Sequence, residues 1–109
     1  MQHPWVGGAL LAAAMILSGR TGQAAETTVD AGRLIALENC ARCHAVARGG
    51  ESPMEEAPPF RRPHERYQID DLAEALAEGI AVGHKEMPPF SFAPAQIDAL
   101  LAYLKSLSR

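Results

Sequence analysis

The sequence predicts a single all-α domain with three or more helices. The chain has 109 residues, of which 48% are hydrophobic and 21% charged, and this length suits one compact domain. Three stretches have apolar residues spaced three and four apart, as on one side of a helix. No stretch has the strict alternation of apolar and polar residues that is typical of a strand, and no segment repeats. We therefore expect helices joined by irregular loops.

Residues 1–25 are predicted to be a secretory signal peptide, which leaves residues 26–109 as the domain. An apolar run from Val6 to Leu17 is followed by small residues up to Ala24 and Ala25, a pattern typical of an exported protein. As a helix the run would rise only about 18 Å, less than the roughly 30 Å of a bilayer core. Retention of this segment as a membrane anchor is the alternative.

Cleavage at this point would leave about 84 residues with nine basic and 13 acidic side chains. The net negative charge argues against nucleic acid as a partner, because phosphate backbones bind basic surfaces. A domain of this size has a core that gives only marginal stability. A covalent staple or a cofactor is therefore expected to supplement the core.

The first helix of the domain is expected to begin at Asp30, whose side chain can accept hydrogen bonds from free backbone amides at a helix start. Leu34, Ile35 and Leu37 follow on one side at helical spacing, and the helix should end near Cys40. It leads directly into the two cysteines of the chain.

The stretch from Ala45 to Tyr67 is predicted to be an irregular loop. It contains two glycines and four prolines and has no apolar periodicity. A loop of about 20 residues without secondary structure is uncommon inside a small domain. We therefore expect this loop to pack on something other than protein, such as a bound cofactor.

Two further helices are expected in the second half of the chain. Asp70 or Asp71 should open the first, with Asp71 and Glu74 at the spacing of a capping box and Gly79 at its end. The last helix has Pro94 in its first turn. Its apolar residues form one stripe: Ile97, Leu100, Leu101, Leu104 and Leu107.

The chemistry of the chain is indicated by Cys40-Ala41-Arg42-Cys43-His44, which has the C-x-x-C-H pattern of covalent haem attachment. Two thiols one helical turn apart can add to the two vinyl groups of one haem, and the adjacent imidazole can reach the iron. The same C-x-x-C spacing occurs in thioredoxin-like sites, which need a βαβ setting that this pattern lacks. A zinc site would have to recruit the distant His64 or His84.

A second axial ligand decides whether haem iron transfers electrons or offers an open position. Met87 is the preferred candidate, because the two prolines after it stiffen the backbone. His84 is the competitor, and ligation by two histidines would lower the reduction potential. Met54 is interpreted as a surface or gap-filling residue, and His64 as part of an exposed arginine-rich run.

With these motifs the chain resembles the class I cytochrome c family, and specifically small bacterial cytochromes with one haem, from about Val29 to Leu107. Gly32 resembles the family glycine at the crossing of the first and last helices, with Tyr103 as its partner. Pro58, or else Pro59, matches the family proline whose carbonyl orients the proximal imidazole. The sequence from Gly83 to Pro88 is similar to the methionine-ligand loop of the family.

The resemblance implies a small cytochrome c fold around one haem c, which is attached to Cys40 and Cys43 and whose iron has His44 and Met87 as axial ligands. It implies a periplasmic one-electron carrier, not an enzyme, with no small-molecule substrate. Redox proteins such as a dehydrogenase, a membrane cytochrome complex or a terminal oxidase would be its partners. The protein is expected to be a monomer with transient membrane contact; a form anchored to the membrane and facing the periplasm is the alternative.

Two other classes of protein have to be distinguished from this prediction. A haem enzyme or gas-binding module would keep the sixth iron position open, and it would bind carbon monoxide rapidly when reduced. A zinc- or disulfide-stabilised interaction module would be colourless and would lose its structure on chelation or reduction.

Overall fold

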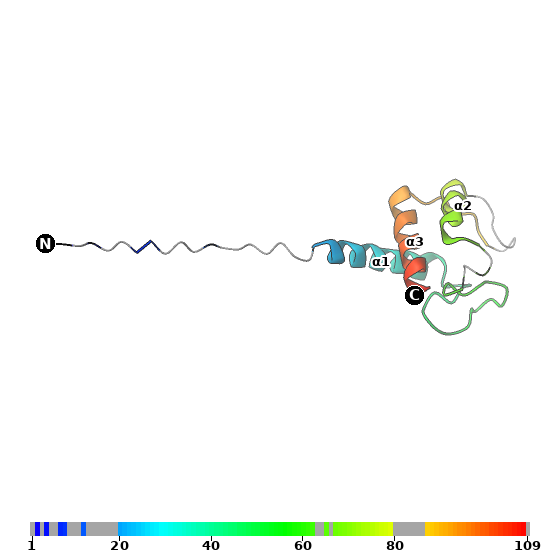
Figure 1. The fold of residues 1–109 in the computed structure, drawn as a ribbon. Helices are drawn as coiled ribbons and strands as arrows, with labels where there is room; N and C mark the ends of the chain where they lie inside the picture. Colours follow the sequence, from blue (N-terminus) through cyan, green and yellow to red (C-terminus); the bar gives the residue numbers. More distant parts are fainter. Residues whose placement is uncertain are drawn as a thin grey trace.

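A computed structural model gives the structure of the protein, and it describes residues 2, 4, 7, 8, 12, 20–62, 65, 67–79 and 87–108. Over these residues the elements are α1 (Arg20–Asn39), the short 3-10 helix η2 (Ile69–Asp71), α2 (Leu72–Glu78) and α3 (Pro94–Leu107), with no strand among them. Figure 1 shows the order of α1, α2 and α3 along the chain. The predicted all-α class with three or more helices is confirmed.

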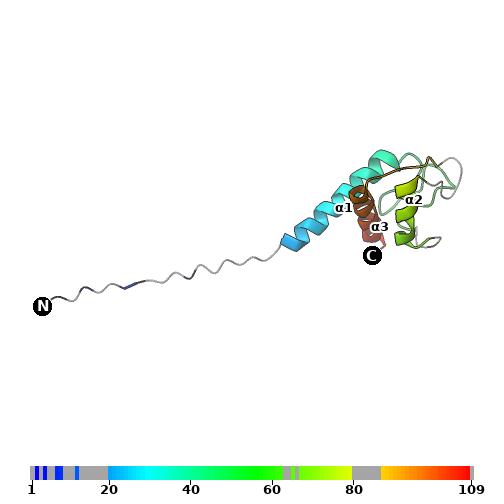
Figure 2. The same ribbon diagram turned by 90° about the horizontal axis from the view of Figure 1, so that it is seen from above.

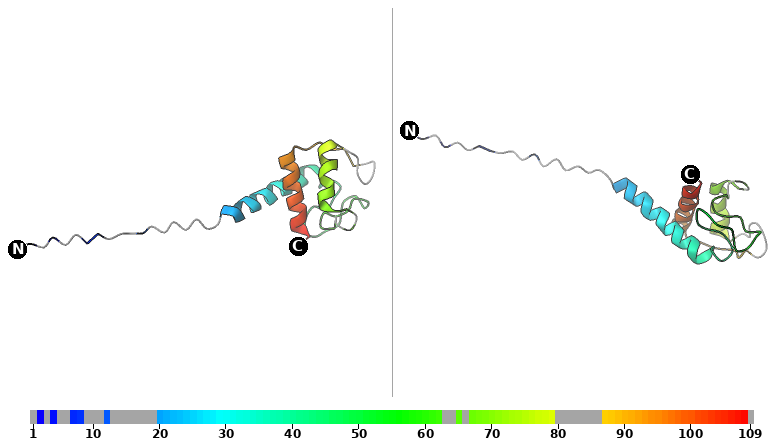
Figure 3. Two further views of the ribbon diagram at one scale, coloured as in Figure 1. Left: turned by 45° about the horizontal axis from the view of Figure 1, so that its top comes forward. Right: turned by 90° about the horizontal axis from the view of Figure 1, so that it is seen from below.

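The fold is organised around the crossing of α1 and α3, which is the most extensive packing between elements. Figure 2 shows α3 crossing the C-terminal half of α1, while the N-terminal half of α1 extends beyond the crossing. α2 lies beside α3, and the loop that follows α1 lies at the C-terminal end of α1 (Figure 3). This arrangement places the cysteine motif next to the core.

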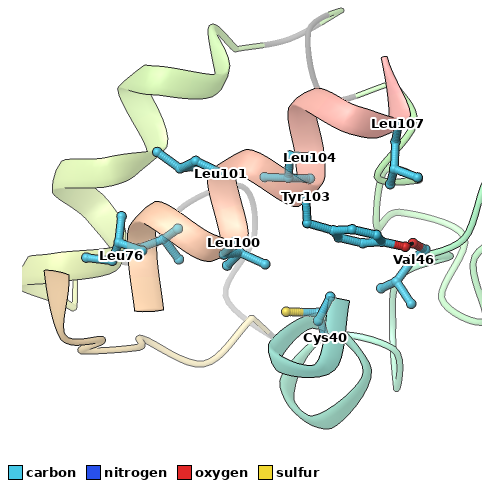
Figure 4. Packing of buried hydrophobic residues seen from close by; sticks show 10 residues of the cluster. Cys40, Val46, Leu76, Leu100, Leu101, Tyr103, Leu104 and Leu107 are labelled. Atoms are coloured by element: carbon cyan, nitrogen blue, oxygen red, sulfur yellow. Dashed lines mark hydrogen bonds between the residues drawn. The ribbon is translucent and has the colours of Figure 1, made fainter. Parts of the chain in front are cut away.

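The core is built mainly from α3. The predicted apolar stripe is confirmed, because its members are at most 8% exposed: Ile97, Leu100, Leu101, Leu104 and Leu107. Tyr103 is also buried, and its hydroxyl donates a hydrogen bond of 2.5 Å to the carbonyl of Val46 (Figure 4). This bond joins α3 to the segment directly after the cysteine motif.

α1 contributes small residues to the core, which corrects the prediction from its leucines. Leu34 and Leu37 are 55% and 45% exposed, whereas Gly32 and Ala36 are buried and Cys40 is 9% exposed. A Cβ atom on Gly32 would lie 1.9 Å from the carbonyl oxygen of Ala99 in α3. The two backbones therefore approach too closely for leucine side chains, and the leucines occupy the opposite side of α1.

α1 begins at Arg20, ten residues before the predicted start at Asp30. Thr27 and Thr28 lie inside this added stretch, and each hydroxyl donates a 2.8 Å hydrogen bond to the carbonyl four residues earlier. Threonine hydroxyls often compete with the backbone hydrogen bonds of a helix. Here both hydroxyls bond to carbonyls of the helix itself. The helix thus passes through the predicted cleavage position without a break.

The start of α2 also differs from the prediction. Asp71 is the N-cap residue, but its side chain makes no capping hydrogen bond. Its backbone angles are helical, φ −69° and ψ −18°, because Asp71 is also the last residue of η2, and a capping side chain needs an extended N-cap. The capping box with Glu74 was therefore a wrong prediction, while Gly79 ends the helix with φ +75° as expected.

α3 begins as predicted, with Pro94 as its first residue after the extended Ala93. The side-chain oxygen of Gln96 accepts a 2.9 Å hydrogen bond from the Ala93 amide, which would otherwise lack a partner in the helix. None of the helices over residues 20–62, 67–79 and 87–108 is long and apolar enough to cross a membrane.

Candidate haem site

The cysteine motif forms a tight turn that continues from the end of α1. The amide of Cys40 donates to the carbonyl of Ala36 at 2.8 Å, and the amides of Cys43 and His44 donate to the carbonyl of Cys40 at 3.2 Å and 2.9 Å. The turn leads from Cys40, which is part of the core, to the half-buried Cys43, and neither cysteine is in a disulfide. Attachment of one planar group through two sulfurs needs this arrangement.

The environment of Cys40 suits a neutral sulfur. Figure 4 shows this residue across from Leu100, in the core cluster. Burial, with a smaller effect from the neighbouring Cys43, raises the pKa of the Cys40 thiol to about 11. A thiolate is therefore strongly disfavoured here. A thioether is neutral and largely apolar, so its burial costs little free energy. The site fits a cysteine that ends as a thioether.

The imidazole of His44 is held on one side by the backbone. Its Nδ1 lies 2.7 Å from the carbonyl oxygen of Pro58, and its ring centroid lies 5.2 Å from that of Phe60. A carbonyl oxygen can only accept a hydrogen bond, so Nδ1 carries the proton of the ring. In the neutral ring Nε2 then has the lone pair, which is the donor that a metal ion requires.

The loop after the motif folds back on it through hydrogen bonds. The amide of Phe60 donates to the carbonyl of Ala45 at 2.9 Å, and the amide of Met54 donates to the carbonyl of Cys43 at 3.1 Å. The amide of Ala45 donates to the hydroxyl of Ser52 at 3.0 Å. The predicted irregular loop therefore has protein partners of its own. Ser52 was not a candidate from the sequence, because no periodicity or motif marks it.

Met87 lies at the start of the last described segment and is half-buried. The residues after it are tied to α2, since the amide of Phe92 donates to the carbonyl of Leu76 at 2.9 Å. The rings of Phe90 and Phe92 stack with centroids 5.1 Å apart.

The remaining ligand candidates of the sequence have different positions. His64 and His84 lie outside the described residues. Met54 is half-buried in the loop that folds back on the motif. The structure thus brings together the two cysteines, His44 and Pro58 at the end of α1, and it places Met87 in a segment fixed to α2.

The fold and this site fit a class of protein in which haem is bound covalently to two cysteines beside an imidazole. The family model for cytochrome c matches residues 29–108, which is most of the chain. The chain therefore belongs to the cytochrome c family. Its cofactor is haem c with iron, and the family supports a haem-binding electron carrier. Searches of curated proteins and of solved structures each found no match.

Proposed function

We propose that this protein is an exported one-electron carrier of the bacterial periplasm, whose haem iron has His44 and Met87 as axial ligands. The hydrogen bond between Nδ1 of His44 and the Pro58 carbonyl carries this proposal. This bond leaves Nε2 available as the ligand atom for iron. His44 is itself the last residue of the cysteine motif.

Bound haem supplies an iron centre that gains or loses one electron. His44 supplies one ligand, and its hydrogen bond to Pro58 strengthens the imidazole as a donor. The thioether of Met87 donates weakly, and apolar residues around the site penalise the extra charge of ferric iron. We therefore expect a fairly positive reduction potential.

Two protein ligands favour electron transfer over catalysis. With both axial positions taken by side chains, no position on the iron remains for a substrate. Few atoms then need to move when the electron is transferred. This supports the expectation that the protein is not an enzyme and has no small-molecule substrate.

The proposed location rests on the sequence, and the proposed partners rest on the likeness to the cytochrome c family. The apolar run and small residues before residue 26 suit export, and haem c is attached outside the cytoplasmic membrane. Membrane retention of the same segment is the alternative. The partners would be redox proteins, such as a dehydrogenase, a membrane cytochrome complex or a terminal oxidase, and not nucleic acid. A monomer that docks weakly, with transient membrane contact, suits repeated electron exchange.

The test is an absorption spectrum of the purified protein, oxidised and reduced, before and after extraction with acidic acetone. We expect a pigment that resists extraction and a weak near-infrared band from sulfur bound to ferric iron. Met87→Ala should abolish this band, lower the potential and let external ligands bind. Met54→Ala, the matched variant of the other methionine in the domain, and His84→Ala should leave the band unchanged.

Other outcomes would overturn parts of the proposal. A colourless protein would refute the haem-based function. Covalent haem without the near-infrared band would exclude Met87 and favour His84 or an open position. Rapid binding of carbon monoxide to the native reduced protein would favour a haem enzyme or a gas-binding module.

A further inference from the structure

The three residues from Ser52 to Met54 contact the peptide groups on both sides of His44. On one side, the amide of Met54 donates to the carbonyl of Cys43, at 3.1 Å. On the other side, the hydroxyl of Ser52 accepts from the amide of Ala45, at 3.0 Å. The residue between them is Pro53, whose ring fixes its own φ angle. We call this stretch the Ser52–Met54 segment.

These two contacts fix the backbone from which the imidazole projects. Each peptide group is planar, so a hydrogen bond to one of its atoms restricts the movement of the whole group. The Cys43 carbonyl belongs to the peptide before His44, and the Ala45 amide belongs to the peptide after it. With both groups restricted, the φ and ψ angles of His44 have a narrow range. The ring is then left with rotation about its side-chain bonds.

The remaining freedom of the ring is removed by Pro58, whose carbonyl lies 2.7 Å from Nδ1. The length and angle of this hydrogen bond depend on the position of the His44 backbone. Among the contacts that hold this backbone within the described residues of the loop, only the one to Ser52 uses a side chain; the bonds from Met54 and Phe60 are between backbone groups. Ser52 is therefore the described loop position at which a side-chain substitution can shift the backbone of His44, whereas the side chain of Phe60 contacts the ring directly.

We propose that Ser52 is a positioning residue for the axial ligand His44, and that its hydroxyl tunes the reduction potential through the hydrogen bond between His44 and Pro58. This inference rests on the proposed ligation of iron by His44. A strong bond at Nδ1 makes the imidazole a better donor and stabilises ferric iron. Loss of the hydroxyl loosens the ring, weakens this bond and raises the potential.

The test compares three variants of the haem-loaded protein. In Ser52→Ala we expect a higher potential and displaced proton NMR signals of the His44 ring in the ferric state. Ser52→Thr keeps a hydroxyl and should restore both towards the wild-type values. Ser106→Ala is the matched control, because this half-buried hydroxyl bonds to the carbonyl of Tyr103 at 2.6 Å, away from the ligand. It should change neither measurement.

An unchanged potential and unchanged ring signals in Ser52→Ala, with only a lower melting temperature, would overturn the inference and leave Ser52 a structural residue. If Ser52→Ala does not fold, amide hydrogen exchange of the wild-type protein decides. Slow exchange at both Ala45 and Met54 supports the inference, and unprotected exchange at Ala45 overturns it. Absence of any iron-induced shift of the wild-type His44 ring would instead refute the proposed ligation itself.

Discussion

The substitution Gly32→Ala tests whether the crossing of α1 and α3 depends on the absence of one methyl group. A Cβ atom at this position would lie 1.9 Å from the oxygen and 2.6 Å from the carbon of the Ala99 carbonyl, and 2.8 Å from Cβ of Tyr103. The first distance is about 1.5 Å short of the 3.4 Å at which ordinary contact begins. Because the nearest atoms belong to the backbone, a side-chain rotation cannot relieve the overlap, and the helices must move apart.

Two opposing effects set the expected size of the change. Alanine is a better helix former than glycine, which by itself would stabilise α1 by about 1 kcal/mol. Overpacking typically costs roughly 1–3 kcal/mol, and an overlap with rigid backbone belongs at the upper end of that range or beyond it. The net loss in the free energy of unfolding should be about 2 kcal/mol or more, which lowers the melting temperature of a domain this size by roughly 10 °C.

Thermal unfolding of the haem-loaded protein, followed by circular dichroism, measures this loss. Ala31→Gly is the matched control, since residue 31 is exposed in the same helix and should lose about 1 kcal/mol through helix propensity alone. If Gly32→Ala melts at or above the wild-type temperature, helix propensity dominates and the close crossing is refuted.

Two further substitutions test contacts of α3. Tyr103→Phe removes the buried hydroxyl that bonds to the Val46 carbonyl; we expect a loss of roughly 1–3 kcal/mol in urea unfolding, because the carbonyl keeps no partner in its place. An unchanged midpoint would show that water replaces the hydroxyl. Lys105→Ala breaks the 2.6 Å ion pair with Asp70, but the two side chains are 48% and 77% exposed. The stability should change by less than about 1 kcal/mol in the same assay, and a larger loss would contradict this reasoning.

Several parts of the fold were predictable because their signals are local. The stripe of α3 repeats at helical spacing, and burial of one side of a helix follows from that spacing alone. Pro94 and Gly79 mark the start of α3 and the end of α2 through their own backbone preferences. The cysteine motif is similarly complete within five residues, so haem attachment could be predicted from the sequence.

The errors in α1 and α2 arose where a neighbouring element decides the outcome. The leucines of α1 have the right spacing for a buried side, but the approach of α3 at Gly32 selects the side with small residues. Asp71 has the right residue type for a cap, but η2 gives its backbone a helical conformation. Asp30 was expected to start a helix that in fact continues through it from Arg20.

The chain by itself determined the helical class, the haem-attachment motif and the candidate ligands, because each depends on residues close together in sequence. Only the tertiary structure decided that the carbonyl of Pro58, and not that of Pro59, faces the His44 ring. It alone also placed Ser52 on the amide of Ala45 and Tyr103 on the carbonyl of Val46. These contacts join residues 7 to 57 positions apart. They depend on the path of a loop without periodicity, which no local pattern specifies.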